Sequence, residues 1–167
     1  MHKKKITMRK TILIPTDFTI TPLLLLKHAA ATSAVELDVI FLYSTPLPDS
    51  ITDLLFYSPK KILEAAVTKE FNEACAIMQN KYPKKIHSIR FELFHGRSKG
   101  AFETLAEINQ VDEAFLPRAN RLSSQKNIFD PSPLIRKSTV SIKEVDLESY
   151  EYIPEKDLLT GLFVSAV

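Results

Sequence analysis

Cysteine is nearly absent from this sequence of 167 residues: Cys75 is the only one, which excludes an internal disulfide. No second thiol and no histidine cluster stands at metal-ligand spacing, so we expect no metal site. No apolar run approaches the roughly 20 residues of a membrane span, and the basic start lacks the apolar stretch of a secretory signal. These absences indicate a cytoplasmic protein that does not contact membranes.

Glycine and tryptophan are scarce as well. The sequence has three glycines and no tryptophan. The glycines are Gly96, Gly100 and Gly161, so none lies between residues 101 and 160. This stretch therefore cannot form the kind of glycine loop whose backbone N–H groups close on phosphates.

Neither sign of charge dominates, since the formal net charge is +2. The first ten residues are nevertheless basic, and residues 144–157 are acidic. A basic run could contact phosphate or anionic lipid, but charges at a chain end are commonly solvated. No nucleic-acid recognition motif accompanies them. We interpret residues 1–8 as a solvated tail and expect no nucleic-acid partner.

The chain does contain several apolar runs that predict strands. Residues 11–15 and 39–43 are short, β-rich and continuous, which is typical of strands buried on both faces. Residues 89–93 alternate apolar with charged side chains, which predicts a strand near an edge of the sheet. Two further strands are predicted over residues 114–116 and from Thr139 to Val145.

Three helices are predicted between the strands, over residues 23–34, 58–82 and 98–108. Their capping residues are Thr19 or Thr21, Ser58 and Ser98. Residues 45–58 and 118–133 are expected as loops, followed by at most about one helical turn over 134–137. The predicted inward-facing positions are Leu63, Val67, Phe71, Ala74, Cys75 and Met78 in the second helix and Ala101, Leu105 and Ile108 in the third.

This alternation predicts an α/β fold, a doubly wound and mostly parallel five-stranded sheet in three layers. The domain should cover residues 9–146, between the tail (1–8) and a C-terminal extension (147–167). In such sheets the ligand crevice opens at the carboxyl ends of the strands. The apolar end of the extension, residues 158–164, must dock somewhere or contact a partner.

The opening of the domain resembles the universal stress protein family. Residues 11–19 read TILIPTDFT, which is similar to the family's "ILVPTDFS" at the end of its first strand. The resemblance implies a Rossmann-like fold of the adenine nucleotide α-hydrolase type, and it covers residues 8–117 well and 118–146 poorly. Further segments that resemble the family are residues 26–29, 39–43, 94–96 and 112–116.

The chain departs from the family at the phosphate loop. ATP-binding members carry Gly-x2-Gly-x9-Gly-Ser/Thr after the fourth strand, whereas the positions in register here hold Pro117, Asn120 and about Asp130. Proline removes a backbone donor, any Cβ obstructs close approach, and a carboxylate repels phosphate. The motif is therefore degenerate, and we expect no bound ATP.

The resemblance nevertheless implies candidate contacts to a nucleotide such as ATP or AMP. Asp17 matches the aspartate that faces base and sugar, and Thr16 and Ile40 match neighbouring contacts. Asp17 fits equally well as a carboxylate that stabilises a turn and a helix N-terminus. The basic residues that could hold an anion at the rim are Arg97, Arg118, Arg121, Lys126, Arg136 and Lys137.

No motif indicates catalysis. His28 lies in an apolar helix and is interpreted as packed, and His95 lies at the rim with no serine, cysteine or carboxylate beside it in any motif. Cys75 lies on an apolar helix face and is interpreted as a buried small hydrophobe. We therefore expect a protein that is not an enzyme.

The sequence thus favours a universal stress protein-like module that acts in stress response or regulation through contacts with an unidentified protein. The resemblance implies a homodimer that pairs through the strand from Thr139 to Val145, where Val140 and Ile142 offer an apolar edge. Two alternatives stay open. One is an adenine-nucleotide sensor that uses Asp17 and rim arginines, and the other is a small nucleotide-dependent hydrolase or transferase.

Overall fold

A five-stranded sheet forms the centre of the structure. Its strands are β1 (Arg9–Thr16), β2 (Glu36–Ser44), β3 (Ile86–Phe94), β4 (Glu113–Pro117) and β5 (Ser141–Val145). The computed structural model describes residues 8–118 and 127–147, and within them the strand order is β3-β2-β1-β4-β5 with every pair parallel. This confirms the predicted doubly wound fold, with β1 central and β3 at an edge.

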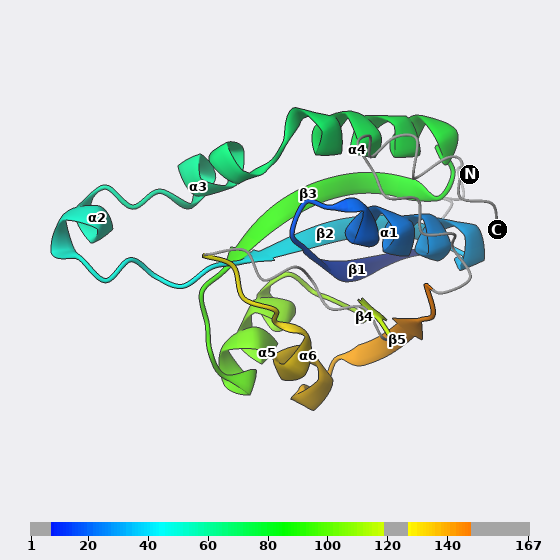
Figure 1. The fold of residues 1–167 in the computed structure, drawn as a ribbon. Helices are drawn as coiled ribbons and strands as arrows, with labels where there is room; N and C mark the ends of the chain where they lie inside the picture. The colour runs from blue at the N-terminus through cyan, green and yellow to red at the C-terminus, as the bar shows by residue number, and fades with distance from the viewer. Residues whose placement is uncertain (1–7, 119–126, 148–167) are drawn as a thin grey trace, which may run out of the picture.

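Helices cover both faces of this sheet (Figure 1). Within the described residues they are α1 (Ile20–Thr32), α2 (Ile51–Leu55), α3 (Pro59–Ala66), α4 (Lys69–Lys81), α5 (Lys99–Ile108) and α6 (Ser132–Lys137). On one face Leu23 of α1 and Phe71 of α4 pack into a cluster with Ile12 of β1. On the other face Phe102 of α5 and Ile135 of α6 share a cluster with β1 and β4 residues. Among the described residues, no helix is long and apolar enough to cross a membrane.

The predicted single helix over residues 58–82 is wrong, because the structure divides it into α3 and α4. Ser58 caps α3 as expected, and its hydroxyl accepts the N–H of Lys61 at 3.3 Å. The backbone becomes extended at Val67, and the hydroxyl of Thr68 then accepts the N–H of Phe71 at 3.1 Å to start α4. A capping hydroxyl begins a new helix where apolar spacing alone predicts continuity.

The predicted inward face of α5 is partly wrong. Ser98 caps the helix by accepting the N–H of Ala101 at 3.1 Å, as expected. The buried residues are Phe102 and Ala106, whereas Ile108 is 76 % exposed. At 3.6 residues per turn, Ile108 lies on a different side of α5 from Phe102 and Ala106, so it faces away from the core.

The connection between β2 and α3 was expected as a loop, but it contains α2. The hydroxyl of Ser50 accepts the N–H of Asp53 at 3.0 Å and caps this short helix. Figure 1 shows α2 as the element farthest from the sheet, at the left of the view. We call residues 47–56 the α2 arm; its exposed large apolar side chains are Leu47, Ile51, Leu54, Leu55 and Phe56.

Cys75 is buried on the sheet-facing side of α4, as the apolar spacing predicts. Burial raises the pKa of its thiol to about 12. The thiol is therefore protonated at neutral pH and unsuited to act as a nucleophile.

Candidate functional site

The five strands end at one edge of the sheet because they are all parallel. From β1 the chain winds outward to β3 and then returns to β4 on the other side of β1. Ligand crevices in doubly wound sheets open at the carboxyl ends beside such a reversal. We call this edge the rim; its strands end at Thr16, Ser44, Phe94, Pro117 and Val145.

The turn after β1 holds its polar groups through local hydrogen bonds. The hydroxyl oxygen of Thr16 accepts the N–H of Phe18 at 2.9 Å. The buried carboxylate of Asp17 accepts the N–H of Thr19 at 3.0 Å and also the hydroxyl of Thr19. Thr19 is the N-cap residue of α1, but its hydroxyl bonds Asp17 instead of a helix N–H. Thr16 and Asp17 therefore have structural partners within the turn.

Phe18 anchors the same turn in an uncommon backbone conformation. Its φ is 59°, in the left-handed region that bulky residues rarely adopt. Its buried ring contacts those of Tyr43, Phe71 and Phe91, at centroid distances of 5.0, 5.2 and 5.9 Å. The packing of this aromatic cluster compensates for the backbone strain.

The other predicted contact residues do not converge beside Asp17. Ile40 is fully buried in the middle of β2. Arg118 follows β4 and is exposed, and its guanidinium lies 3.8 Å from the carboxylate of Asp146. Arg121 lies outside the described residues, as do Asn120 and Lys126. A ligand-binding role for this set stays a prediction.

The remaining rim arginines differ in their partners. Arg136 of α6 lies 3.3 Å from the carboxylate of Glu144 and donates to the carbonyl oxygen of Pro117 at 3.3 Å. Arg97, between β3 and α5, has no hydrogen-bond or ion-pair partner among the described residues. Arg97 is therefore the rim arginine that the described structure leaves available to an anion.

Residues 127–130, which we call the rim segment, lie across the end of β2. The N–H of Phe129 donates to the carbonyl oxygen of Ser44 at 3.0 Å. The ring of Phe129 lies 6.0 Å from that of Phe94, and Ile128 packs against the cluster on the α1 face. Asp130 accepts the N–H of Ser132 at 2.9 Å, close to the start of α6. Sequence reasoning missed this arrangement, for which the signal was an apolar pair within a polar stretch.

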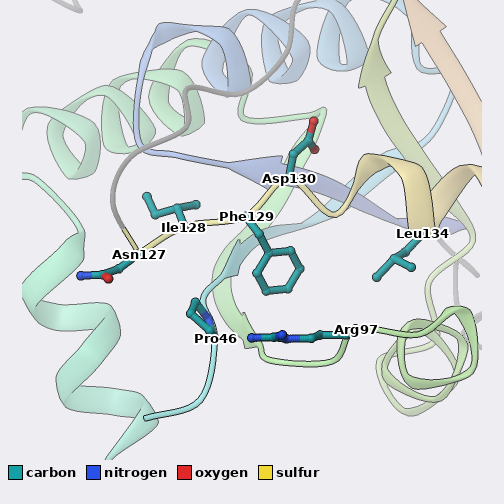
Figure 2. Close-up of a pocket in the computed structure, with 7 residues that line it drawn as sticks. All are labelled: Pro46, Arg97, Asn127, Ile128, Phe129, Asp130 and Leu134. Atoms are coloured by element: carbon teal, nitrogen blue, oxygen red, sulfur yellow. The ribbon is translucent and has the colours of Figure 1, made fainter. Parts of the chain in front are cut away.

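A cavity of about 350 Å³ opens between the rim segment and the ends of β2 and β3. Figure 2 shows Arg97 and Pro46 on the same side of the rim segment as the ring of Phe129, whereas the carboxylate of Asp130 points to the other side. We call this space the rim cavity; its lining residues are Pro46, Arg97, Asn127, Ile128, Phe129, Asp130 and Leu134.

His95 contacts the two residues Thr45 and Tyr57, which flank the α2 arm. Its Nδ1 lies 2.6 Å from the carbonyl oxygen of Thr45, which places a proton on Nδ1. Its Nε2 then accepts the hydroxyl of Tyr57, whose pKa is raised by burial. Both ring nitrogens of His95 therefore form hydrogen bonds to residues on either side of the α2 arm. His28 lies half-buried in α1.

Across residues 8–118 and 127–147, no group of three His, Cys, Asp or Glu side chains is placed to hold a metal ion.

The fold and rim define a doubly wound α/β protein with its crevice at the strand ends. The universal stress protein UspA from Lactobacillus plantarum superposes with a TM-score of 0.54 at 13 % identity, over 81 % of this chain and 97 % of that chain. A structure described as a test case for assigning the function of hypothetical protein MJ0577 gives 0.53 at 22 % identity, over 82 % and 95 %. Hypothetical protein PH0823 gives 0.51 at 17 % identity, over 82 % and 95 %. The chain therefore has the fold of universal stress protein structures, as the resemblance implied.

No protein-family model matches the chain, and no curated protein matches it.

Proposed function

We propose that this chain is a universal stress protein-like regulatory module that is not an enzyme, binds no ATP and acts through protein contacts. The observation that carries the proposal is the course of the rim segment. Phe129 and Ile128 lie across the end of β2, beside the crevice where a doubly wound sheet would place a ligand. We infer that these apolar side chains and this hydrogen-bonded backbone narrow the space available to a nucleotide at the rim.

The residues at the degenerate motif support the same proposal. Pro117 is the buried last residue of β4 and has no N–H, and its carbonyl oxygen is bonded by Arg136. Asp130 stands at about the sequence position where the family resemblance implies a glycine next to phosphate. Pro117 therefore lacks a backbone donor for a triphosphate, and the carboxylate of Asp130 would repel one.

The candidate catalytic groups have structural partners instead of a reactive arrangement. Asp17 bonds Thr19, and His95 bonds Thr45 and Tyr57. Cys75 is buried and protonated. Because a nucleophile needs an adjacent base that is free to take its proton, these contacts argue against catalysis at the rim.

Nucleotide titration tests the proposal. The chain has no tryptophan, so a co-purified nucleotide would raise absorbance near 260 nm well above that of the protein. We expect no such excess and no heat on titrating ATP or AMP by calorimetry. Saturable heat that disappears in Asp17→Ala would establish the nucleotide sensor instead. ATP turnover that disappears in the same variant would establish the hydrolase or transferase.

We propose further that two chains pair through β5. This strand is at an edge of the sheet formed by the described residues, which leaves its outer backbone groups for a partner strand. Val140 and Ile142 do not supply a free apolar edge, because both pack against the cluster on the α5 face. Pairing would therefore rest on main-chain hydrogen bonds, flanked by exposed Ser141, Lys143 and Glu144.

Light scattering after size-exclusion chromatography tests this pairing. We expect the mass of two chains for the wild type and for Glu144→Ala, which keeps the backbone N–H. The N–H of Glu144 faces away from β4, because the carbonyl oxygen of the next residue, Val145, accepts the N–H of Arg118 from the β4 side and backbone groups alternate sides along a strand. Glu144→Pro should therefore shift the mass toward one chain, because proline at an edge strand blocks pairing. A wild-type protein that runs as a single chain at every concentration contradicts the dimer.

The α2 arm also supports a module that works through contacts. Its five exposed large apolar side chains are clustered within ten residues, at a distance from the sheet core. Clusters of this kind mark interaction surfaces more often than isolated exposed leucines do.

A further inference from the structure

The rim cavity has the size and wall chemistry of a site for a small molecule. Its volume of about 350 Å³ lies within the range of roughly 300–1,000 Å³ that ligand sites occupy. Such sites are lined mainly by apolar side chains with a few polar groups that orient the ligand. Here the apolar part of the wall consists of Pro46, Ile128, Phe129 and Leu134.

The apolar wall is held in place by its own contacts. Phe129 is fixed at its backbone by Ser44 and at its ring by Phe94. Leu134 belongs to α6 and packs against the cluster on the α5 face. A ligand would therefore meet a preformed surface and would not have to order it on binding.

The charge of the cavity is set by Arg97. Its guanidinium has no partner among the described residues, in contrast to Arg118 and Arg136, which pair with Asp146 and Glu144. The acidic residue of the lining, Asp130, accepts the N–H of Ser132 and points away from Arg97 in Figure 2. A guanidinium beside an apolar wall favours a carboxylate, which it can bind through two parallel hydrogen bonds.

From this arrangement we propose that the rim cavity binds a small organic carboxylate. The apolar body of the ligand lies against Phe129 and Leu134, and its carboxylate is bound by Arg97. One guanidinium balances one negative charge, so a ligand with several charges would leave some of them desolvated without a partner. This inference goes beyond the regulatory role proposed above and does not depend on it, because neither the dimer nor the absence of ATP enters the argument.

Phenylacetate is a suitable probe, because it joins one aromatic ring to one carboxylate. Titration into ¹⁵N-labelled full-length protein, followed by amide chemical shifts, should give saturable shifts at residues of the rim segment. A ligand with about ten non-hydrogen atoms is expected to reach a Kd of about 0.1–1 mM. Phenylacetamide, which keeps the shape and removes the charge, should bind at least about tenfold more weakly.

Two variants distinguish phenylacetate binding in the rim cavity from attraction to the positive charge of the rim in general. Arg97→Gln should weaken phenylacetate binding at least about tenfold. Arg118→Gln should leave it unchanged, because that arginine already pairs with Asp146. Both residues are exposed, so thermal unfolding should show that both variants are folded.

The proposal is overturned if phenylacetate causes no saturable shift at the rim segment up to about 10 mM. Equal binding of phenylacetate and phenylacetamide overturns it as well, and so does equal weakening by Arg97→Gln and Arg118→Gln. A third variant, Leu134→Trp, should fill the cavity and abolish the shifts while Arg97 is retained. None of these results alters the nucleotide or dimer tests, so failure of this inference is distinguishable from failure of the proposed function.

Discussion

The N–H of Phe129 donates to the carbonyl oxygen of Ser44, with 3.0 Å between nitrogen and oxygen. This bond joins the end of β2 to the rim segment, so residues 127–130, which precede α6, lie across the rim. The same serine carries a buried hydroxyl that has no hydrogen-bond partner among the described residues. The backbone of Ser44 therefore holds the rim segment, whereas its side chain forms no hydrogen bond within the described residues.

Ser44→Ala should leave the free energy of unfolding unchanged or raise it by up to about 1 kcal/mol. The substitution removes a buried hydroxyl without breaking a hydrogen bond, and an unpaired buried hydroxyl is unfavourable. Urea unfolding followed by far-UV circular dichroism measures this. The matched control is Thr16→Val, which loses the bond to Phe18 and should cost about 1–3 kcal/mol. A clear loss of stability in Ser44→Ala would show that its hydroxyl has a partner outside the described residues.

Phe129→Ala should lower the free energy of unfolding by about 1–2 kcal/mol. Its ring is only partly buried, so the loss should be smaller than for a core phenylalanine. Asn127→Ala, an exposed position in the same rim segment, should change stability by less than about 0.5 kcal/mol. Equal stability of the two variants in urea would contradict the packing of Phe129 against the rim.

Asp17→Ala should destabilise the fold by about 1–2 kcal/mol through loss of its bonds to Thr19. Thr19→Val removes the hydroxyl donor alone. Because the two residues bond each other, the double variant should cost less than the sum of the single changes, with a coupling of about 0.5–1.5 kcal/mol. A double-mutant cycle of unfolding energies checks this, and strict additivity would refute a structural role for the pair.

Phe18→Ala should cost about 3–5 kcal/mol, because it empties the centre of an aromatic cluster. Phe18→Gly should be more stable than Phe18→Ala, by about 1 kcal/mol, because glycine adopts φ of 59° without strain. At Phe71, which lies in α4, the order should reverse and alanine should be the more stable replacement. Thermal or urea unfolding of the four variants decides whether the backbone of Phe18 is strained.

Cys75 should be nearly inert to thiol reagents in the native protein. Its pKa of about 12, against an ordinary 9.0, lowers the thiolate fraction at pH 8 by a large factor. Reaction with a disulfide reagent should be at least about a hundredfold slower in the native protein than in urea. A reaction rate of the native protein close to that of the unfolded protein contradicts the burial of the thiol.

The same thiol should make the free energy of unfolding depend on pH. The folded state keeps the thiol proton at pH values at which the unfolded state loses it, so the free energy of unfolding falls as pH rises from 9.0 to about 12. The Cys75→Ala variant should lack that contribution.

Much of the fold could be predicted from local patterns. Continuous apolar runs at residues 11–15 and 39–43 indicated buried strands, because a strand covered on both faces has no polar side. The alternation at residues 89–93 indicated the edge strand β3 for the opposite reason. The break between α3 and α4 could not be predicted in the same way, since Thr68 is equally compatible with a helix interior until its hydroxyl bonds Phe71.

The candidate site was less predictable than the fold. The motif TILIPTDFT located the turn after β1, and Asp17 and Thr16 lie there. The pairing of Arg118 with Asp146 depends on β4 and β5 ending side by side, which no local pattern contains. The same holds for Tyr57 and His95, which meet because the chain from the α2 arm passes the end of β3.

By itself the sequence determined the order of the five strands, the lone buried thiol and the absence of glycine from residues 101–160, because each of these depends on residue type and spacing alone. Only the tertiary structure decided that Phe129 lies over Ser44 and that Arg97 faces an apolar cavity beside it. These contacts join residues far apart in the chain. They form because the parallel strands bring their carboxyl ends to one rim, where a partly apolar segment can bury its side chains.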